Sequence, residues 1–108
     1  MNKYLIGYYV KADGERPVVT YIKNKNPADQ GRISYKQKRL EEKGPFLMMP
    51  HAKKFSGTKI YELRPEGMRL FYYFKDKAAV FVHATDKKDF KQSDIALAEK
   101  RRKELEGK

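Results

Sequence analysis

The stretch GTKIYELRPEGMRLFYYFKDKAAVFVHATDKK, residues 57–88, decides the fold because it holds three runs of strand-forming residues. The runs TKIYELR, MRLFYYF and AAVFVHAT are rich in aromatic and β-branched side chains, which favour strands. The links between them, PEG and KDK, are far shorter than the crossover that parallel neighbours need. The stretch therefore predicts three adjacent antiparallel strands.

Helices and further strands flank these three runs. Pro17 and Pro27 suit the first turns of two helices, Asn26 suits an N-cap, and Gly44 suits the end of the second helix. The elements predicted are a strand over residues 4–10, helices over 16–26, 27–43 and 92–106, and a short strand near 53–55. Their order indicates one α+β domain over residues 1–108, with helices beside a largely antiparallel sheet.

Cations interrupt the three strands, although a buried sheet needs none of them. Arg69 alternates onto the same strand face as Phe71 and Tyr73, and Arg64 ends the preceding strand. Guanidinium groups bind phosphate bidentately and aromatic rings stack on bases, so such a face indicates nucleic-acid binding. The alternative is that these cations are surface residues paired with carboxylates such as Glu62.

The charge of the whole chain favours the first interpretation. Its 108 residues carry 25 Lys and Arg against 14 Asp and Glu, which gives a net charge of +11. A field of this sign attracts polyanions, of which nucleic acid is the commonest in cytoplasm. An anionic membrane surface is the second candidate, but it needs a strongly amphipathic helix, and none stands out.

Several other classes of protein lack support in the sequence. No apolar run reaches the length of about 20 residues that spans a bilayer, and the N-terminal segment lacks the pattern of a secretory signal. Two histidines and no cysteines give no zinc-site spacing, and there is no glycine-rich phosphate loop or nucleophile elbow. We therefore expect a cytoplasmic protein without a metal or cofactor.

Three segments together resemble a known family. KGPFLMMPHAKKFSGTKIYELRP, GMRLFYYF and VFVHATDKK, in this order, resemble the HigB-type, phage-derived Gp49-like branch of the RelE/ParE toxin superfamily. The resemblance implies a RelE-like fold, in which two N-terminal helices and a C-terminal helix pack on a curved, largely antiparallel sheet of four or five strands. It also implies ribosome-dependent mRNA cleavage without a metal, by attack of a 2′-hydroxyl on the adjacent phosphate.

The resemblance also implies partners. The family's toxins are neutralised by an antitoxin, here a helix-turn-helix protein of the HigA type, and the toxin–antitoxin complex is expected to bind operator DNA through the antitoxin. The other partners implied are the ribosome and mRNA, with no membrane. Two alternatives stay open, a ParE-like inhibitor of DNA gyrase and a non-toxic relative that binds only antitoxin and operator DNA.

The resemblance assigns candidate catalytic residues. Arg69 matches the strand arginine that stabilises the phosphate, and Arg64 is the second candidate. Lys88 falls where relatives carry a cation near the end of the last strand. An ordinary lysine holds its proton too tightly for efficient acid catalysis at neutral pH, which favours an electrostatic role for Lys88.

The general base is less evident, because RelE has lysines where this chain has Ile60 and Glu62. His51 is the replacement we predict, since its ordinary pKa suits proton transfer at neutral pH. The alternative for His51 is a loop histidine without a catalytic role. Glu62 is expected to be a structural partner of a nearby cation. His83, on the strand face of Phe81, is expected to be structural.

The remaining candidates would bind RNA rather than react with it. Exposed lysines contact the phosphate backbone and aromatic rings stack on bases. The RNA-binding residues predicted are Lys53, Lys54, Lys59, Lys87, Phe71 and Tyr73. For each lysine alone, the alternative is a solvated side chain.

Overall fold

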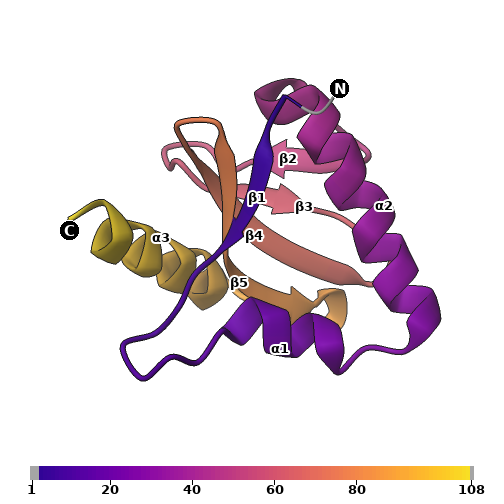
Figure 1. Cartoon of the computed structure of the whole chain (residues 1–108), viewed down its shortest axis with the longest axis horizontal. Coiled ribbons are helices and arrows are strands. Elements are labelled where there is room, and N and C mark those ends of the chain that lie inside the picture. The colour runs from indigo at the N-terminus through magenta and orange to yellow at the C-terminus, as the bar shows by residue number, and fades with distance from the viewer. Residues whose placement is uncertain (1–2, 108) are drawn as a thin grey trace.

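A computed structural model describes residues 3–107 and shows a five-stranded sheet with helices on both of its faces (Figure 1). The strands are β1 (Leu5–Tyr8), β2 (Ala52–Lys54), β3 (Tyr61–Leu63), β4 (Met68–Lys75) and β5 (Ala78–Asp86). The helices are α1 (Pro17–Lys23), α2 (Pro27–Lys43) and α3 (Gln92–Glu106), with short 3-10 turns η1 (Gly44–Phe46) and η2 (Lys87–Asp89).

The strand order is β1-β5-β4-β3-β2. The pairs β2–β3, β3–β4 and β4–β5 are antiparallel, whereas β1 lies parallel to β5 at the edge. The prediction of three adjacent antiparallel strands is confirmed, and so is the α+β class with a largely antiparallel sheet. The parallel contact of β1 is the part that the sequence pattern did not predict.

The helices α2 and α3 begin and end where the sequence predicts. The side chain of Asn26 accepts a hydrogen bond from the backbone N–H of Asp29 at 2.8 Å, which caps α2. Gly44 ends α2 with a φ of +56°, and a Cβ at this position would collide with the ring of Tyr4. No helix within residues 3–107 combines the length and apolarity needed to cross a membrane.

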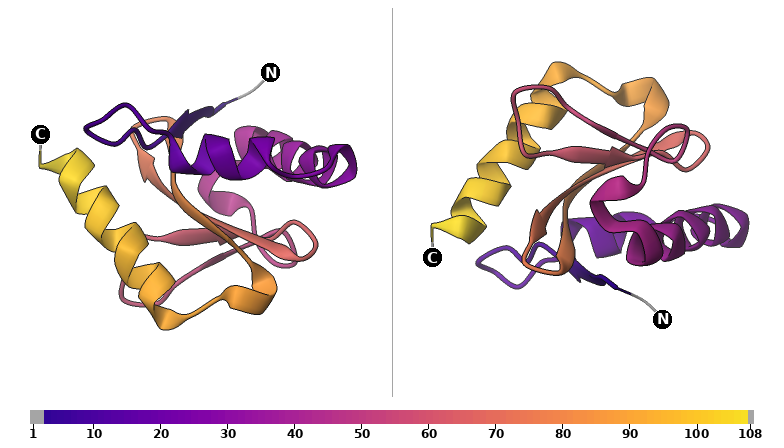
Figure 2. Two further views of the ribbon diagram at one scale, coloured as in Figure 1. Left: turned by 90° about the horizontal axis from the view of Figure 1, so that it is seen from below. Right: turned by 90° about the horizontal axis from the view of Figure 1, so that it is seen from above.

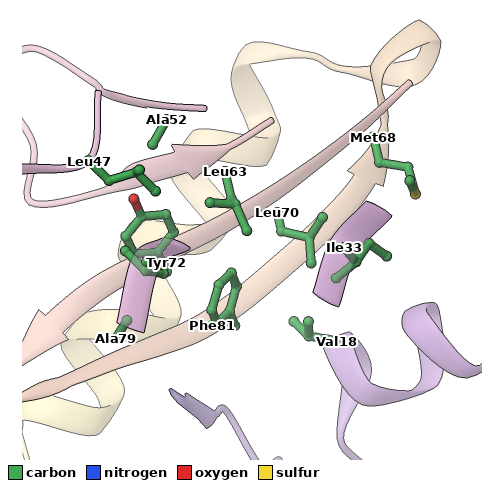
Figure 3. Packing of buried hydrophobic residues seen from close by; sticks show 11 residues of the cluster. Val18, Ile33, Leu47, Ala52, Leu63, Met68, Leu70, Tyr72, Ala79 and Phe81 are labelled. Atoms are coloured by element: carbon green, nitrogen blue, oxygen red, sulfur yellow. The ribbon is translucent and has the colours of Figure 1, made fainter. Parts of the chain in front are cut away.

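The helices cover opposite faces of the sheet (Figure 2). Val18 of α1 and Ile33 of α2 pack against one face, where Leu70 and Phe81 belong to the larger core (Figure 3). On the other face Ala98 of α3 joins a second core, which also contains Tyr9, Ile60, Phe71, Tyr73 and Val82. The sheet is therefore buried on both faces along most of its length.

A β-bulge in β5 corrects one expectation from simple alternation. Phe71 pairs with His83, but Tyr72 pairs with Phe81, so Val82 is the extra residue. His83 is thereby turned onto the α3 face, away from the face of Phe81. There its ring stacks on Phe71 at 5.5 Å, and Nε2 lies 2.8 Å from the Asp94 carboxylate of α3. The structural role expected for His83 is confirmed.

Candidate phosphate-binding site

Arg64 and Arg69 meet at one end of the sheet because a tight turn joins β3 to β4. Arg64 directly follows β3 and Arg69 is the second residue of β4, on the α3 side of the sheet. Glu62 lies between them, with Oε1 3.4 Å from the Arg69 Nε and Oε2 3.6 Å from the Arg64 Nε. The structural role of Glu62 as a partner of these cations is confirmed.

This cluster keeps a net positive charge because one carboxylate faces two guanidinium groups. The Glu62 side chain is 7% exposed, the Arg69 side chain 8% and the Arg64 side chain 26%. Burial raises the pKa of Glu62, although Arg69 and Arg64 oppose the shift. Burial and the neighbouring Arg64 lower the pKa of Arg69, but a guanidinium remains charged in proteins. The single carboxylate therefore neutralises only one of the two guanidinium charges.

The backbone and neighbouring side chains hold the two guanidinium groups by their other nitrogens. The Nη1 of Arg69 donates to the carbonyl of Met68 at 2.7 Å, and the Nη1 of Arg64 lies 3.0 Å from the sulfur of Met49. Because the Nε atoms face Glu62, each guanidinium group is held at both its Nε and its Nη1 atom. Fixed donors stabilise a developing negative charge without reorganising during the reaction.

Above the arginine pair lies an open surface depression of about 290 Å³, which we call the arginine hollow. It is lined by Met49, Pro50, Arg64, Glu66, Arg69 and Lys87. Lys87 reaches it because its backbone N–H donates to the carbonyl of Gly67 at 2.9 Å, which ties η2 to the β3–β4 turn. Three of the predicted cations, Arg64, Arg69 and Lys87, thus share one hollow large enough for a phosphate group.

Lys88 lies next to this hollow rather than in it. It is exposed and lines a second depression, the lysine hollow, which Lys87 and Glu66 share with the arginine hollow. Asp86 fixes the chain just before these lysines, because it accepts hydrogen bonds from the Tyr21 hydroxyl and the Lys25 Nζ, each at 2.6 Å. Lys88 thus lies beside the arginine hollow, and the electrostatic role expected for it stays a prediction.

His51 does not line the arginine hollow. Its carbonyl accepts from the backbone N–H of Arg64 at 2.9 Å, while its Nδ1 lies 2.7 Å from the Nζ of Lys36 on α2. Burial, Lys36 and Arg39 lower the pKa of His51, so the imidazole is neutral at neutral pH. An ammonium at Lys36 donates to Nδ1 and leaves the proton on Nε2. In this geometry His51 offers a donor and not the lone pair that a base needs.

The predicted RNA-binding lysines separate into two groups. Lys53 and Lys54 are exposed on β2, where Lys53 pairs in register with Glu62, beside the arginines. Lys59 is also exposed but precedes β3, and Arg64 follows β3. Because a strand rises by roughly 3.3 Å per residue, Lys59 lies at the opposite end from the arginine pair. The structure does not bring Lys59 to the arginine hollow.

Burial corrects the prediction that Phe71 and Tyr73 stack on RNA bases. Their exposed fractions are 0% and 1%, because α3 and neighbouring aromatic rings cover this face. Phe71 stacks on Phe55 and Phe90, with ring centroids 6.0 and 5.9 Å apart. Neither ring presents a free face, so both belong to the core.

Sequence reasoning missed cations that tertiary packing brings to this end of the sheet. Lys25 follows α1, Arg32 and Lys36 lie on α2, and all three line hollows adjacent to the arginine pair. Figure 1 shows the reason, since the end of β3 and the start of β4 point toward α2. The sequence signal for Arg32 and Lys36 was the high lysine and arginine content of residues 27–43, which does not include Lys25.

The donor types around the hollow are nitrogen cations rather than metal ligands. Within residues 3–107, no cluster of three or more His, Cys, Asp or Glu side chains is arranged to hold a metal ion. The arrangement can bind an anion and stabilise negative charge that develops on it. A phosphate group matches the fixed guanidinium forks.

Comparison with known proteins identifies a family and a solved structure of similar fold. The family model described as "Phage derived protein Gp49-like" matches residues 20–103. A chain in the crystal structure of the RelB–RelE antitoxin–toxin complex from Methanococcus jannaschii has a similar fold, with a TM-score of 0.55 at 14% identity over 78% of this chain and 91% of that one. Comparison with curated proteins finds no significant match. The chain belongs to the phage-derived Gp49-like family.

Proposed function

We propose that this protein is the toxin of a type II toxin–antitoxin system and cleaves mRNA on the ribosome. The observation that carries the proposal is the pair of guanidinium groups, Arg64 and Arg69, held by a single buried carboxylate beside an open hollow. Family membership and the RelE-like fold support it independently.

The proposed reaction is attack of a ribose 2′-hydroxyl on the adjacent phosphate. The 2′-hydroxyl loses its proton to solvent as its oxygen bonds to phosphorus. The bond to the 5′-oxygen breaks and this oxygen takes up a proton from solvent, so the products are a 2′,3′-cyclic phosphate and a 5′-hydroxyl. Negative charge increases on the phosphoryl oxygens in the transition state. Arg69 and Arg64 supply the fixed donors for that charge, and Lys87 and Lys88 supply longer-range attraction.

The proposed partners follow from the same assignment. The similar solved structure is a toxin bound to its antitoxin. We infer a helix-turn-helix antitoxin of the HigA type for this chain, with operator DNA bound through the antitoxin. Substrate mRNA and the ribosome place the proposed activity in the cytoplasm.

Induced expression in bacteria tests the function against its alternatives. We expect growth arrest accompanied by cleavage within translated messages, and relief of both when the antitoxin is co-expressed. Supercoiling of purified plasmid by DNA gyrase should be unaffected by the protein. Arrest with intact messages and inhibited gyrase would assign the ParE-like function instead, and growth without arrest would indicate a non-toxic relative.

A further inference from the structure

Tyr35 is an exposed aromatic residue whose position the fold does not explain. It lies on α2, two residues after the buried Ile33, so it is on the side of the helix that faces away from the core. Its exposed fraction is 56%. Within residues 3–107 its ring stacks on no other aromatic side chain and its hydroxyl forms no hydrogen bond.

This ring borders a depression that adjoins the arginine hollow. We call it the tyrosine hollow; it is lined by Arg32, Tyr35, Lys36, Pro50, Arg64 and Glu66. Pro50, Arg64 and Glu66 also line the arginine hollow, so the two depressions lie side by side. A ligand whose phosphate contacts Arg64 and Arg69 therefore has an aromatic ring next to it.

The side chains of the two hollows are suited to different parts of a nucleotide, although cations and Glu66 line both. The arginine hollow has the fixed guanidinium pair. The carboxylate of Glu66, 87% exposed and 3.8 Å from the Arg32 Nε, stands where the hollows meet. A carboxylate repels phosphate but accepts hydrogen bonds from base amino groups. The tyrosine hollow alone of the two has an aromatic ring, which suits it to a base better than to a second phosphate.

We propose that the tyrosine hollow binds an unpaired nucleobase next to the scissile phosphate, stacked on the ring of Tyr35. The inference rests on the proposed RNA cleavage and deepens it, because it assigns to α2 the stacking that Phe71 and Tyr73 are too buried to provide. Stacking tolerates any base, so Tyr35 contributes to RNA affinity and positioning more than to sequence choice.

The test compares cleavage of mRNA on purified ribosomes by the wild type and three variants. Tyr35→Ala removes the ring, Tyr35→Phe keeps it, and Phe46→Ala removes an aromatic residue that is 81% exposed but lines a different depression. We expect Tyr35→Ala to lower kcat/KM by roughly tenfold or more. Tyr35→Phe should recover most of the activity that Tyr35→Ala loses, because the ring is kept, and Phe46→Ala should stay within about twofold of the wild type. Equal activity of Tyr35→Ala and Phe46→Ala would overturn the inference. The proposed function would still hold in that case, provided that the wild type cleaves the mRNA.

A second measurement changes the RNA as well as the protein. An mRNA with an abasic nucleotide on one side or the other of the cleaved bond removes the stacking partner from the RNA. In the wild type, one of the two abasic substrates should lose as much activity as Tyr35→Ala does. That substrate combined with Tyr35→Ala should show no further loss, since both changes remove one contact. Additive losses would overturn the inference, and absence of cleavage by the wild type would refute the proposed function itself.

Discussion

At the scale of single residues, the site depends on Glu62 holding two cations. Its carboxylate oxygens contact the Nε atoms of Arg64 and Arg69, which otherwise repel one another. The carboxylate is buried, so the arrangement is part of the fold rather than a mobile surface pair. A single negative charge leaves the pair free to bind an anion.

Arg69 is the residue whose loss should be most damaging to activity. We expect Arg69→Ala to lower the cleavage rate about 100- to 1,000-fold, the usual cost of removing one fixed transition-state donor. Arg69→Lys keeps the charge but loses the fork, and should restore only part of the rate. Single-turnover cleavage measures both. A rate for Arg69→Ala close to that of the wild type would remove Arg69 from the mechanism.

Residue positions also show what the sequence could and could not predict about the site. The meeting of Arg64 and Arg69 was predictable, because only a short turn separates them. The Lys36 partner of His51 and the position of Tyr35 were not, because both depend on how α2 packs beside the β3–β4 turn. Phe71 and Tyr73 were placed on the right strand face, but the position of α3 over that face was not evident.

At the scale of elements, the contact between α1 and the end of β5 sets the position of the lysine turn. Asp86 closes β5 and accepts from Tyr21 of α1 and from Lys25 just after it. These hydrogen bonds lower the pKa of Asp86, while burial and the same carboxylate raise the pKa of Tyr21. Tyr21 and Lys25 thus stabilise the ionised Asp86 carboxylate in the folded state.

Asp86→Asn should therefore lower stability in a pH-dependent way. We expect a loss of about 1 kcal/mol at pH 7, since hydrogen bonds to a charged group are lost at a partly exposed site. Because the folded pKa lies below the ordinary 3.8, the stabilisation is complete above that value and disappears as pH falls through the folded pKa. Urea unfolding at several pH values measures it, with the exposed Asp89→Asn as control. A wild-type advantage that grew in acid would contradict this sign.

The elements themselves were largely predictable, with exceptions that have physical causes. Cap residues set the limits of α2, and short links forced β3, β4 and β5 to be antiparallel neighbours. The bulge at Val82 left no local signal, because a register shift depends on how two strands pair. The parallel contact of β1 with β5 joins segments about 70 residues apart, which local periodicity does not report.

At the scale of the whole molecule, the cations behind the net charge of +11 lie at different distances from the arginine hollow. Arg64, Arg69 and Lys87 line the arginine hollow and Lys53 lies beside it, whereas Lys59 lies at the other end of β3. All of these cations add to the net charge that attracts RNA. Salt screens each exposed charge beyond about 8–10 Å at ordinary ionic strength, so a cation stabilises a bound phosphate only when it lies close to it. Position should therefore matter as well as charge.

Two charge reversals that give variants of equal net charge test whether the position of a lysine matters. Lys53→Glu, beside the arginine pair, should reduce cleavage at low salt several-fold more than Lys59→Glu. The difference should narrow as salt is raised, because screening weakens the contribution of Lys53. Cleavage rates on ribosomes at two salt concentrations measure it. Equal effects of the two reversals would mean that only total charge matters.

The most direct test of the proposed function is the chemistry of the RNA ends. Purified ribosomes carrying a defined mRNA would be incubated with the wild type and with Arg69→Ala, and the fragments analysed at both new ends. Attack by the 2′-hydroxyl must give a 2′,3′-cyclic phosphate and a 5′-hydroxyl, only when ribosomes are present and at a much lower rate with Arg69→Ala. Intact mRNA, 5′-phosphate ends, or equal cleavage by Arg69→Ala would contradict the proposed mechanism.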